Sequence, residues 1–240
     1  MRIVRLAPSA RSLLSLPIAS LALLAACNDS VPTGGGPSTA TTHVRVVQAI
    51  PDAPALDLLV SDTVAFSGLT FDTVTDYATL GADSDTVVIR RSSDQQAVLQ
   101  TGFTLGSGVF YTLVLYNPLA DPHAKLFLDD TTTPPNGNAK LRVIHLAPSM
   151  GIVDLYLSAP GTDITAQSPI RTGITFPFAS VYLPVIAGTY DIRFTETGTK
   201  NIVLDMGNVT LGNGQNRTIA LLDHAGLGLP ISAVVLKDRN

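Results

Sequence analysis

The chain has 240 residues, a formal net charge of −4, 14% charged side chains and 45% apolar ones. Disordered chains show the opposite balance, so we expect a packed core. Lys and Arg form no basic patch, which argues against nucleic acid as a partner. Trp is absent, while 19 Gly and 16 Pro punctuate a chain rich in Thr and Val. This composition is typical of many short strands joined by tight turns.

The N-terminal segment has the layout of an export signal. Arg2, Arg5 and Arg11 precede an uncharged apolar stretch over residues 13–26. A stretch of this length is too short to cross roughly 30 Å of hydrocarbon comfortably. We therefore interpret residues 1–26 as a signal peptide.

This stretch ends in Leu24, Ala25, Ala26 and Cys27, the only cysteine of the chain. The tetrad resembles the lipobox of bacterial lipoproteins. The resemblance implies that the Cys27 thiol is lipidated, that the chain is cleaved before it, and that the mature protein is held on a membrane of the bacterial envelope. We expect the outer membrane or the cell surface rather than the inner membrane. The alternatives are an ordinary secretory signal followed by an unrelated cysteine and, less favoured, an uncleaved membrane anchor.

The next segment is poor in large apolar side chains. Residues 28–42 are rich in Gly, Ser, Thr and Pro and include the run Gly34-Gly35-Gly36. Such composition predicts a flexible tether. Residues 27–42 are therefore interpreted as the lipidated cysteine and its tether, ahead of the folded part.

The folded part is an internal repeat. Residues 44–60 align without gaps to residues 141–157, 97 positions further on. The identical pairs are Arg45/Arg142, Val46/Val143, Pro51/Pro148, Asp57/Asp154 and Leu58/Leu155. The sequence thus predicts one domain over 43–130, a linker over 131–140 and a second domain over 141–240. The second copy has a longer loop at 158–175.

Each copy is predicted to contain seven short strands. In the first they fall at 44–49, 56–60, 74–80, 86–91, 97–103, 109–116 and 124–129. In the second they fall at 141–147, 153–157, 178–184, 189–195, 202–210, 216–222 and 232–237. Short strands separated by turn residues predict an all-β fold, with two tandem antiparallel β-sandwiches.

The recurring pattern is Val/Leu-Arg-Val, then Pro, then Asp-Leu, with a later Tyr and a Leu-Gly-x-Gly turn (Leu105–Gly108 and Leu211–Gly214). It resembles the bacterial domain of unknown function 4397 family over both repeats. The resemblance implies immunoglobulin-like sandwiches on an exported protein and no established activity. The family often has His where this chain has His145, but the first copy has Gln48. A His-dependent function common to both copies is therefore excluded.

No catalytic or metal-binding motif stands out. Gly106-Ser107-Gly108 lacks the Gly-x-Ser-x-Gly spacing of a nucleophile elbow, and the second copy has Asn213 in place of the serine. His43, His123, His145 and His224 show no metal-ligand spacing. Asp83-x-Asp85 has no counterpart in the second copy and is interpreted as a solvated turn. We predict no catalytic residues, no metal and no cofactor.

Asp57 and Asp154 are repeat-defining structural candidates together with Arg45 and Arg142. Two acids in separate domains cannot be assumed to face each other as a glycosidase pair. We expect each carboxylate to accept local hydrogen bonds, from the preceding Pro-containing turn or, preferably, from the arginine of its own copy.

The best interpretation is a non-enzymatic, lipid-anchored binding module of the cell envelope. Its expected partners are the membrane, through Cys27, and an envelope protein or polysaccharide. The first alternative is a purely structural spacer, and an envelope enzyme is third. A binding module should expose an apolar or aromatic patch, for which the 158–175 loop is the leading candidate.

Overall fold

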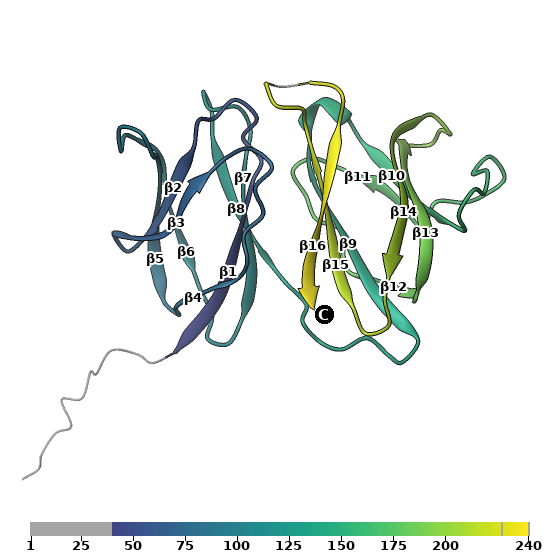
Figure 1. Ribbon diagram of the computed structural model, residues 1–240, viewed down its shortest axis with the longest axis horizontal. Coiled ribbons are helices and arrows are strands. Elements are labelled where there is room, and N and C mark those ends of the chain that lie inside the picture. The colour runs from purple at the N-terminus through teal and green to yellow at the C-terminus, as the bar shows by residue number, and fades with distance from the viewer. Residues whose placement is uncertain (1–39, 227, 240) are drawn as a thin grey trace, which may run out of the picture. The chain divides into compact units, whose positions relative to one another are not determined.

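The computed structural model describes residues 40–226 and 228–239, which form two β-sandwiches and one short 3₁₀ helix, η1 (Pro148–Met150) (Figure 1). The predicted all-β fold class is confirmed. Cys27, the rest of the lipobox and the predicted tether up to residue 39 lie outside the described residues. Within the described part, no helix has the length and apolarity needed to cross a membrane.

The first sandwich consists of two four-stranded sheets. Its inner sheet, which faces the second sandwich, has the order β4-β1-β7-β8, and its outer sheet has the order β3-β2-β5-β6. The inner strands are β1 (Thr41–Gln48), β4 (Ala78–Gly81), β7 (Phe110–Tyr116) and β8 (His123–Leu128). The outer strands are β2 (Leu56–Val60), β3 (Thr63–Leu69), β5 (Ser84–Arg91) and β6 (Ala97–Thr104).

The second sandwich repeats this arrangement strand for strand. Its inner sheet has the order β12-β9-β15-β16 and its outer sheet the order β11-β10-β13-β14. The inner strands are β9 (Asn138–Leu146), β12 (Leu183–Ile186), β15 (Asn216–Leu222) and β16 (Ser232–Arg239). The outer strands are β10 (Val153–Ser158), β11 (Arg171–Ile174), β13 (Gly188–Glu196) and β14 (Ile202–Leu211).

Each inner sheet contains one parallel pair. β1 pairs with β7 in parallel, and β9 pairs with β15 in the same way, whereas the other strand pairs are antiparallel. The predicted antiparallel sandwich is therefore mixed at its centre. Because β1 and β9 lie between two neighbours, their backbone groups are paired on both edges.

Two of the predicted strands begin later than expected. The first halves of the segments 74–80 and 178–184 make only isolated bridges, Val47 with Val74 and Ile144 with Ala179, and regular pairing starts at β4 and β12. β3 and β11 were not predicted. Each contains a glycine with positive φ, Gly68 (+67°) or Gly173 (+65°), which interrupts the alternation expected of a strand.

Each sandwich has its own apolar core, formed by alternate residues of its strands. In β1, Val44 and Val46 point into the first core, as their period of two requires. Leu141 and Val143 of β9 do the same in the second core. The strands β1 and β9 are buried on their opposite faces as well.

Those opposite faces meet between the sandwiches. A third apolar cluster joins the two inner sheets, and we call it the interdomain cluster. Its buried members are Val47, Ala49, Val114, Tyr116, Ile144, Leu146, Ala220, Leu222 and Leu236. The two sandwiches are therefore packed through a shared core, which explains why strands such as β15 are buried along their whole length.

Candidate functional site

The first sandwich is open along one side. At the opposite side its edge strands β6 and β8 approach each other. Between the edge strands β3 and β4 there is instead a groove of about 510 Å³. We call it the edge groove. It lies at the end of the sandwich where β1 begins, because Gly81 of β4 pairs with Thr41.

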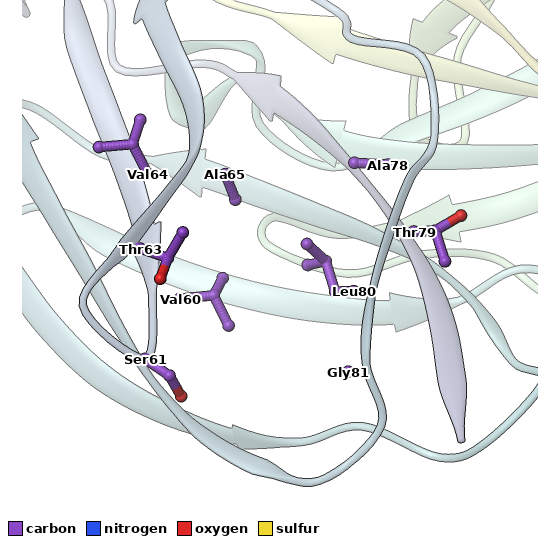
Figure 2. Close-up of a pocket in the computed structure, with 9 residues that line it drawn as sticks. All are labelled: Val60, Ser61, Thr63, Val64, Ala65, Ala78, Thr79, Leu80 and Gly81. Carbon is purple, nitrogen blue, oxygen red and sulfur yellow. The ribbon is translucent and has the colours of Figure 1, made fainter. Parts of the chain in front are cut away.

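Apolar side chains from two separate sheets form the middle of the edge groove. Val60 from the end of β2 and Leu80 from β4 lie on opposite walls (Figure 2). Both are half-buried and pack against the first core, as does Ala65 of β3. The groove is thus a place where the core reaches the surface. No aromatic side chain lines it.

A tight hairpin forms the wall on the β3 side. Ser61 and Asp62 connect β2 to β3 with φ of +46° and +61°, as a two-residue hairpin turn with left-handed residues requires. The β2–β3 pairing also shifts register twice, at Leu56/Leu58 and Leu58/Leu59. Such irregularities bend an edge strand and re-aim its side chains. Here they accompany a β3 strand that stands apart from β4.

The two strands beside the groove carry none of the side chains that normally protect a sheet edge. β3 reads TVAFSGL and β4 reads ATLG, without charge or proline. Four other edge strands do carry such residues: Lys125 in β8, Arg171 in β11, Pro184 in β12 and Asp205 in β14. The edge strand β6, which approaches β8, lacks them as well. Unprotected edges are the usual sites at which an additional strand pairs with a sheet.

In the 158–175 segment, the leading candidate from the sequence, residues 171–174 form β11, and the loop before β11 is held against its own sandwich. The Lys200 ammonium donates hydrogen bonds to the carbonyl oxygens of Ile164 (2.7 Å) and Gln167 and lies 4.6 Å from the Tyr156 ring centroid. Ile164 is buried at 4% exposure. The loop therefore covers the outer face of the second outer sheet. The shallow pocket beside it, about 300 Å³, is smaller than the edge groove.

A network of buried charges crosses the contact between the sandwiches. Arg45 of the first sandwich donates to the carboxylate of Asp238 and, with Nη1, to the carbonyl of Lys237 at 3.0 Å. Arg142 of the second sandwich donates to Asp129 at 2.5 Å and to the carbonyl of Leu128 at 2.8 Å. Each arginine thus binds the last strand of the other sandwich.

The remaining groups of the network repeat with the same symmetry. Thr112 and Tyr77 donate to Asp129 at 2.6 and 2.7 Å. Thr218 and Tyr182 donate to Asp238 at 2.7 and 2.9 Å. The guanidinium groups of Arg45 and Arg142 also lie over the rings of Tyr77 and Tyr182, at 4.8 and 4.6 Å from the centroids. We call these eight residues the crossed network.

Burial alters the acid–base properties of the crossed network. Burial, together with the neighbouring Asp129, raises the pKa of Tyr77 well above its usual range, and burial does the same for Tyr182. Burial lowers the pKa of Arg45, but the nearby Asp238 and Asp129 carboxylates outweigh it, so the net shift is upward. The arginines and aspartates form a matched set of two positive and two negative charges, which makes their burial tolerable.

The expected pairing of each Arg with the repeat-defining Asp of its own copy is wrong. Asp57 accepts hydrogen bonds from the Ser92 hydroxyl (2.5 Å) and the Gly68 amide (3.0 Å), with Arg90 3.8 Å away. These partners belong to β3 and to the turn after β5, not to the Pro-containing turn. Arg45 and Asp57 point to opposite sides of the sandwich, because β1 belongs to the inner sheet and β2 to the outer sheet.

Asp154 has the same role in the second copy. It accepts hydrogen bonds from the Gly173 and Gly198 amides, both at 2.9 Å, and from the Thr197 hydroxyl at 2.5 Å. Burial alone would raise its pKa, but the hydrogen bonds from Thr197, Gly198 and Gly173 outweigh burial and lower it. Local hydrogen bonding of the two aspartates was predicted correctly, while the donors were not.

His145 and Gln48 perform the same structural task. Nδ1 of His145 accepts from the amide of Ala147 (3.3 Å), so Nε2 carries the proton and donates to the Gly151 carbonyl (2.7 Å). Oε1 of Gln48 accepts from the amide of Ile50, also two residues ahead (2.6 Å). Burial lowers the pKa of His145. The histidine therefore satisfies backbone groups at a bend.

The described residues contain no cluster of three or more His, Cys, Asp or Glu side chains that could hold a metal ion. His224 is exposed and contacts the carbonyl of Ala225, whereas His145 is buried and contacts the carbonyl of Gly151. The turn around Ser107 is a structural one, since Gly108 and its counterpart Gly214 both have positive φ, +72° and +79°. The edge groove was not predicted, because it depends on how two strands distant in sequence lie in space.

Comparisons with known proteins add little on function. No curated protein matches the chain. Two solved structures are similar over most of their length: a family 26 carbohydrate-binding module of Eubacterium rectale Amy13K in complex with maltoheptaose, and a structure described as alpha-glucan binding by a streptococcal virulence factor. They are 10% and 13% identical, cover 82% and 75% of this chain and 96% and 92% of their own, and have TM-scores of 0.27 and 0.25. Because both TM-scores are low, neither the details of these folds nor their ligands can be carried over to this chain.

One family model matches. The matched residues, 42–156, include the first sandwich and extend into β10 of the second. The resemblance that the sequence suggested over both repeats is therefore supported for the first repeat and for the beginning of the second. The family to which residues 42–156 are similar is described as Domain of unknown function (DUF4397).

Proposed function

We propose that the protein is a non-catalytic recognition module, anchored by lipid on Cys27 to a membrane of the bacterial envelope. The first sandwich binds an extended segment of a partner in the edge groove. The second sandwich supports the first through the interdomain cluster and the crossed network. The export signal and lipobox of the sequence support the location, and the edge groove supports the recognition role.

The observation that carries the proposal is the open side of the first sandwich. Two edge strands without charge or proline flank apolar side chains of the core, and the space between them is about 510 Å³. A partner strand can pair with such an edge through its main chain and place alternate side chains in the groove. Its main-chain hydrogen bonds supply affinity and its side chains supply specificity.

A site-specific crosslink tests the recognition role. Thr63→Cys places a thiol at the edge groove, and lipidation of Cys27 would leave it as the sole free thiol. We expect a thiol-reactive photo-crosslinker on this variant to capture a discrete partner in the native bacterium. The matched control is Ser93→Cys, at the exposed turn after β5, on the opposite end of the sandwich from the groove. Equal capture by both variants, or by neither, would contradict the proposal.

The anchoring is tested independently of any partner. Growth with an alkyne-tagged fatty acid should label the protein, and Cys27→Ser should abolish the label. The wild-type protein should fractionate with membranes, whereas the variant should not. Labelling that persists in Cys27→Ser would refute lipidation at this residue.

A second candidate function is a rigid spacer, which the crossed network favours. Two sandwiches joined by a shared apolar cluster and buried ion pairs behave as one rigid unit rather than as two domains that move independently. A spacer requires this rigid unit but not the edge groove. Loss of the protein's cellular function when the crossed network is disrupted, with full function retained in variants of the edge groove, would support the spacer.

A further inference from the structure

The walls of the edge groove have counterparts in the second copy, because the repeated strands share one register. Ala78 of β4 lies opposite Val44 of β1, and Leu183 of β12 lies opposite Leu141, the repeat partner of Val44. Leu183 is therefore the counterpart of Ala78. The isobutyl group that the second copy has at this position is a methyl group in the first.

The two neighbouring wall residues remain branched and aliphatic in both copies. Leu80, two residues after Ala78, corresponds to Val185, and Val60 corresponds to Leu157. In the second copy all three counterparts pack against the core. The first copy thus keeps two of the apolar walls and lacks most of the third side chain.

Two phenylalanine rings pack against the first core without closing this space. Phe66 of β3 and Phe103 of β6 both contact the core, but neither lines the edge groove, which has about 510 Å³ with both rings in place. Ala78 and Leu80 point from β4 toward Val60 (Figure 2). The open space therefore lies between the two sheets, where the shortened side chain of Ala78 leaves it.

The lining of the edge groove favours an uncharged aliphatic occupant. Its nine lining residues are aliphatic, glycine or hydroxyl-bearing, and none of them is charged or aromatic. A charged side chain that entered the groove would lose water without gaining a counter-ion. Sugar rings are usually bound on an aromatic side chain, which none of the nine residues provides.

The main chain of β3 supplies the second part of the recognition. β3 is an edge strand of seven residues, whereas β4 has four. An extended segment that pairs with the free edge of β3 continues the outer sheet toward β4, and its alternate side chains face the space between the sheets. The greater length favours β3 over β4 as the strand to which a partner pairs.

We propose that the edge groove binds a partner polypeptide as a strand added to β3, with one branched aliphatic side chain (Leu, Ile or Val) placed between Val60 and Leu80. This side chain takes the place of the isobutyl group that Leu183 supplies in the second copy. The inference rests on the proposed recognition role and names the chemistry of the partner.

Methyl NMR of the mature chain carrying Cys27→Ser tests the inference with the capped peptide acetyl-Thr-Thr-Leu-Thr-Thr-amide. We expect this peptide to shift the methyl resonances of Val60, Ala65 and Leu80 and the amide resonances of β3, with a Kd in the millimolar range, as suits so short a ligand. The same peptide with Asp in place of Leu should bind at least about tenfold more weakly. Equal binding of the two peptides would overturn the aliphatic assignment.

Maltoheptaose and octanoate are the competing probes for a glycan and an acyl chain. We expect neither to shift the amide resonances of β3. Groove shifts with maltoheptaose but not with the Leu peptide would overturn the inference in favour of a glycan. Methyl shifts with octanoate in the absence of any shift with the peptide would overturn it in favour of an acyl chain.

The residue of the second copy provides the matching variant. Ala78→Leu should fill the groove, raise the melting temperature and weaken binding of the Leu peptide about tenfold or more, whereas Ser93→Leu should change neither. If Ala78→Leu does not fold, Val60→Leu introduces the second copy's residue on the opposite wall and should also weaken binding. Unchanged peptide binding in a folded groove-filling variant would overturn the assignment.

The two proposals fail in different ways. Partner capture through Thr63→Cys without any shift by the Leu peptide would retain the recognition role and reject the aliphatic partner strand. Shifts by the peptide without partner capture would retain the groove chemistry and reject the recognition role in the cell.

Discussion

At the residue scale, several buried polar side chains satisfy hydrogen-bonding groups of the backbone. His145 and Gln48 are the clearest case, since two different side chains bond to the amide two residues ahead. Histidine differs only in its ability to take up a proton. A protonated His145 could no longer accept from the Ala147 amide, so its neutral form is built into the native state.

The free energy of unfolding should therefore depend on pH through His145. Burial lowers its native pKa below the value of 6.5 for an unfolded chain. Below about pH 6.5 the unfolded state therefore binds more protons than the native state. The contribution of His145 to the free energy of unfolding is thus complete above about pH 6.5 and is lost as pH falls through the native pKa. Denaturant unfolding at several pH values should show this decline in the wild type and a smaller one in His145→Gln.

The reciprocal variant is the control. Gln48→His should add an acid-sensitive decline to the first sandwich. Asp223, whose pKa burial raises, contributes with the opposite sign and is common to all variants, so the differences between variants isolate the histidine. Identical pH profiles for the wild type and His145→Gln would refute the assignment.

Asp57 and Asp154 should each be needed for stability. Each carboxylate accepts hydrogen bonds from main-chain amides and a hydroxyl that alanine would leave unsatisfied, at a cost of about 2–3 kcal/mol. Thermal or denaturant unfolding of Asp57→Ala and Asp154→Ala measures this loss in the free energy of unfolding. The hydrogen bonds from Ser92 and Gly68 lower the pKa of Asp57, so its contribution is lost as pH falls below about 3.8. A cost below about 0.5 kcal/mol would contradict this role.

At the element scale, the same strand order supports different edges in the two copies. In the first, the chain returns through a two-residue turn into β3 and leaves the edge groove open. In the second, the chain leaves β10 into the 158–175 loop, which covers the outer sheet. A short sequence difference after one strand thus decides which side of a sandwich is free.

Lys200 should control the order of that loop. Lys200→Met removes the ammonium that donates to Ile164 and Gln167 and keeps most of the side chain's length. We expect amide hydrogen exchange in residues 160–168 to become about tenfold faster or more, with little change in the melting temperature. Lys237→Met, on β16, is the control and should leave exchange in the loop unchanged. Unaltered protection in Lys200→Met would show that Ile164 alone holds the loop.

At the scale of the whole molecule, the crossed network makes one unit of two sandwiches. Each arginine is almost fully buried and donates a hydrogen bond to a carboxylate of the other sandwich, while Arg45 also lies 3.5 Å from Asp129 of its own sandwich. Burying a charge is costly unless the charge is paired. The network therefore disfavours any state in which an arginine loses its carboxylate partner without gaining contact with water. The apolar interdomain cluster adds the favourable burial.

A double-mutant cycle should locate the partner of Arg45. Arg45→Met leaves Asp238 buried without its cation and should cost about 3–5 kcal/mol in the free energy of unfolding. Combined with Asp238→Asn, it should show a coupling energy of about 1 kcal/mol or more, because the two groups touch. The same cycle with Asp57→Asn should show a coupling below about 0.5 kcal/mol. The reverse result would restore the pairing within one repeat.

Local patterns were enough to predict the repeat, the all-β class and most strands, because alternation and turn residues act over a few positions. The sequence of β1 contains one further informative pattern. Val44 and Val46 alternate with Arg45 and Val47, so both of its faces are largely apolar, and both are buried. Read as a strand with two covered faces, this pattern predicts the contact between the sandwiches.

By itself the sequence determined an all-β chain with two copies of one strand pattern and no catalytic motif. Only the tertiary structure decided which aspartate meets Arg45, since Asp57, Asp129 and Asp238 are equivalent as charges and differ only in position. It likewise decided that β3 and β4 stand apart and leave the edge groove. The physical reason is that strand propensity is local, whereas ion pairing and grooves depend on distances between segments far apart in the chain.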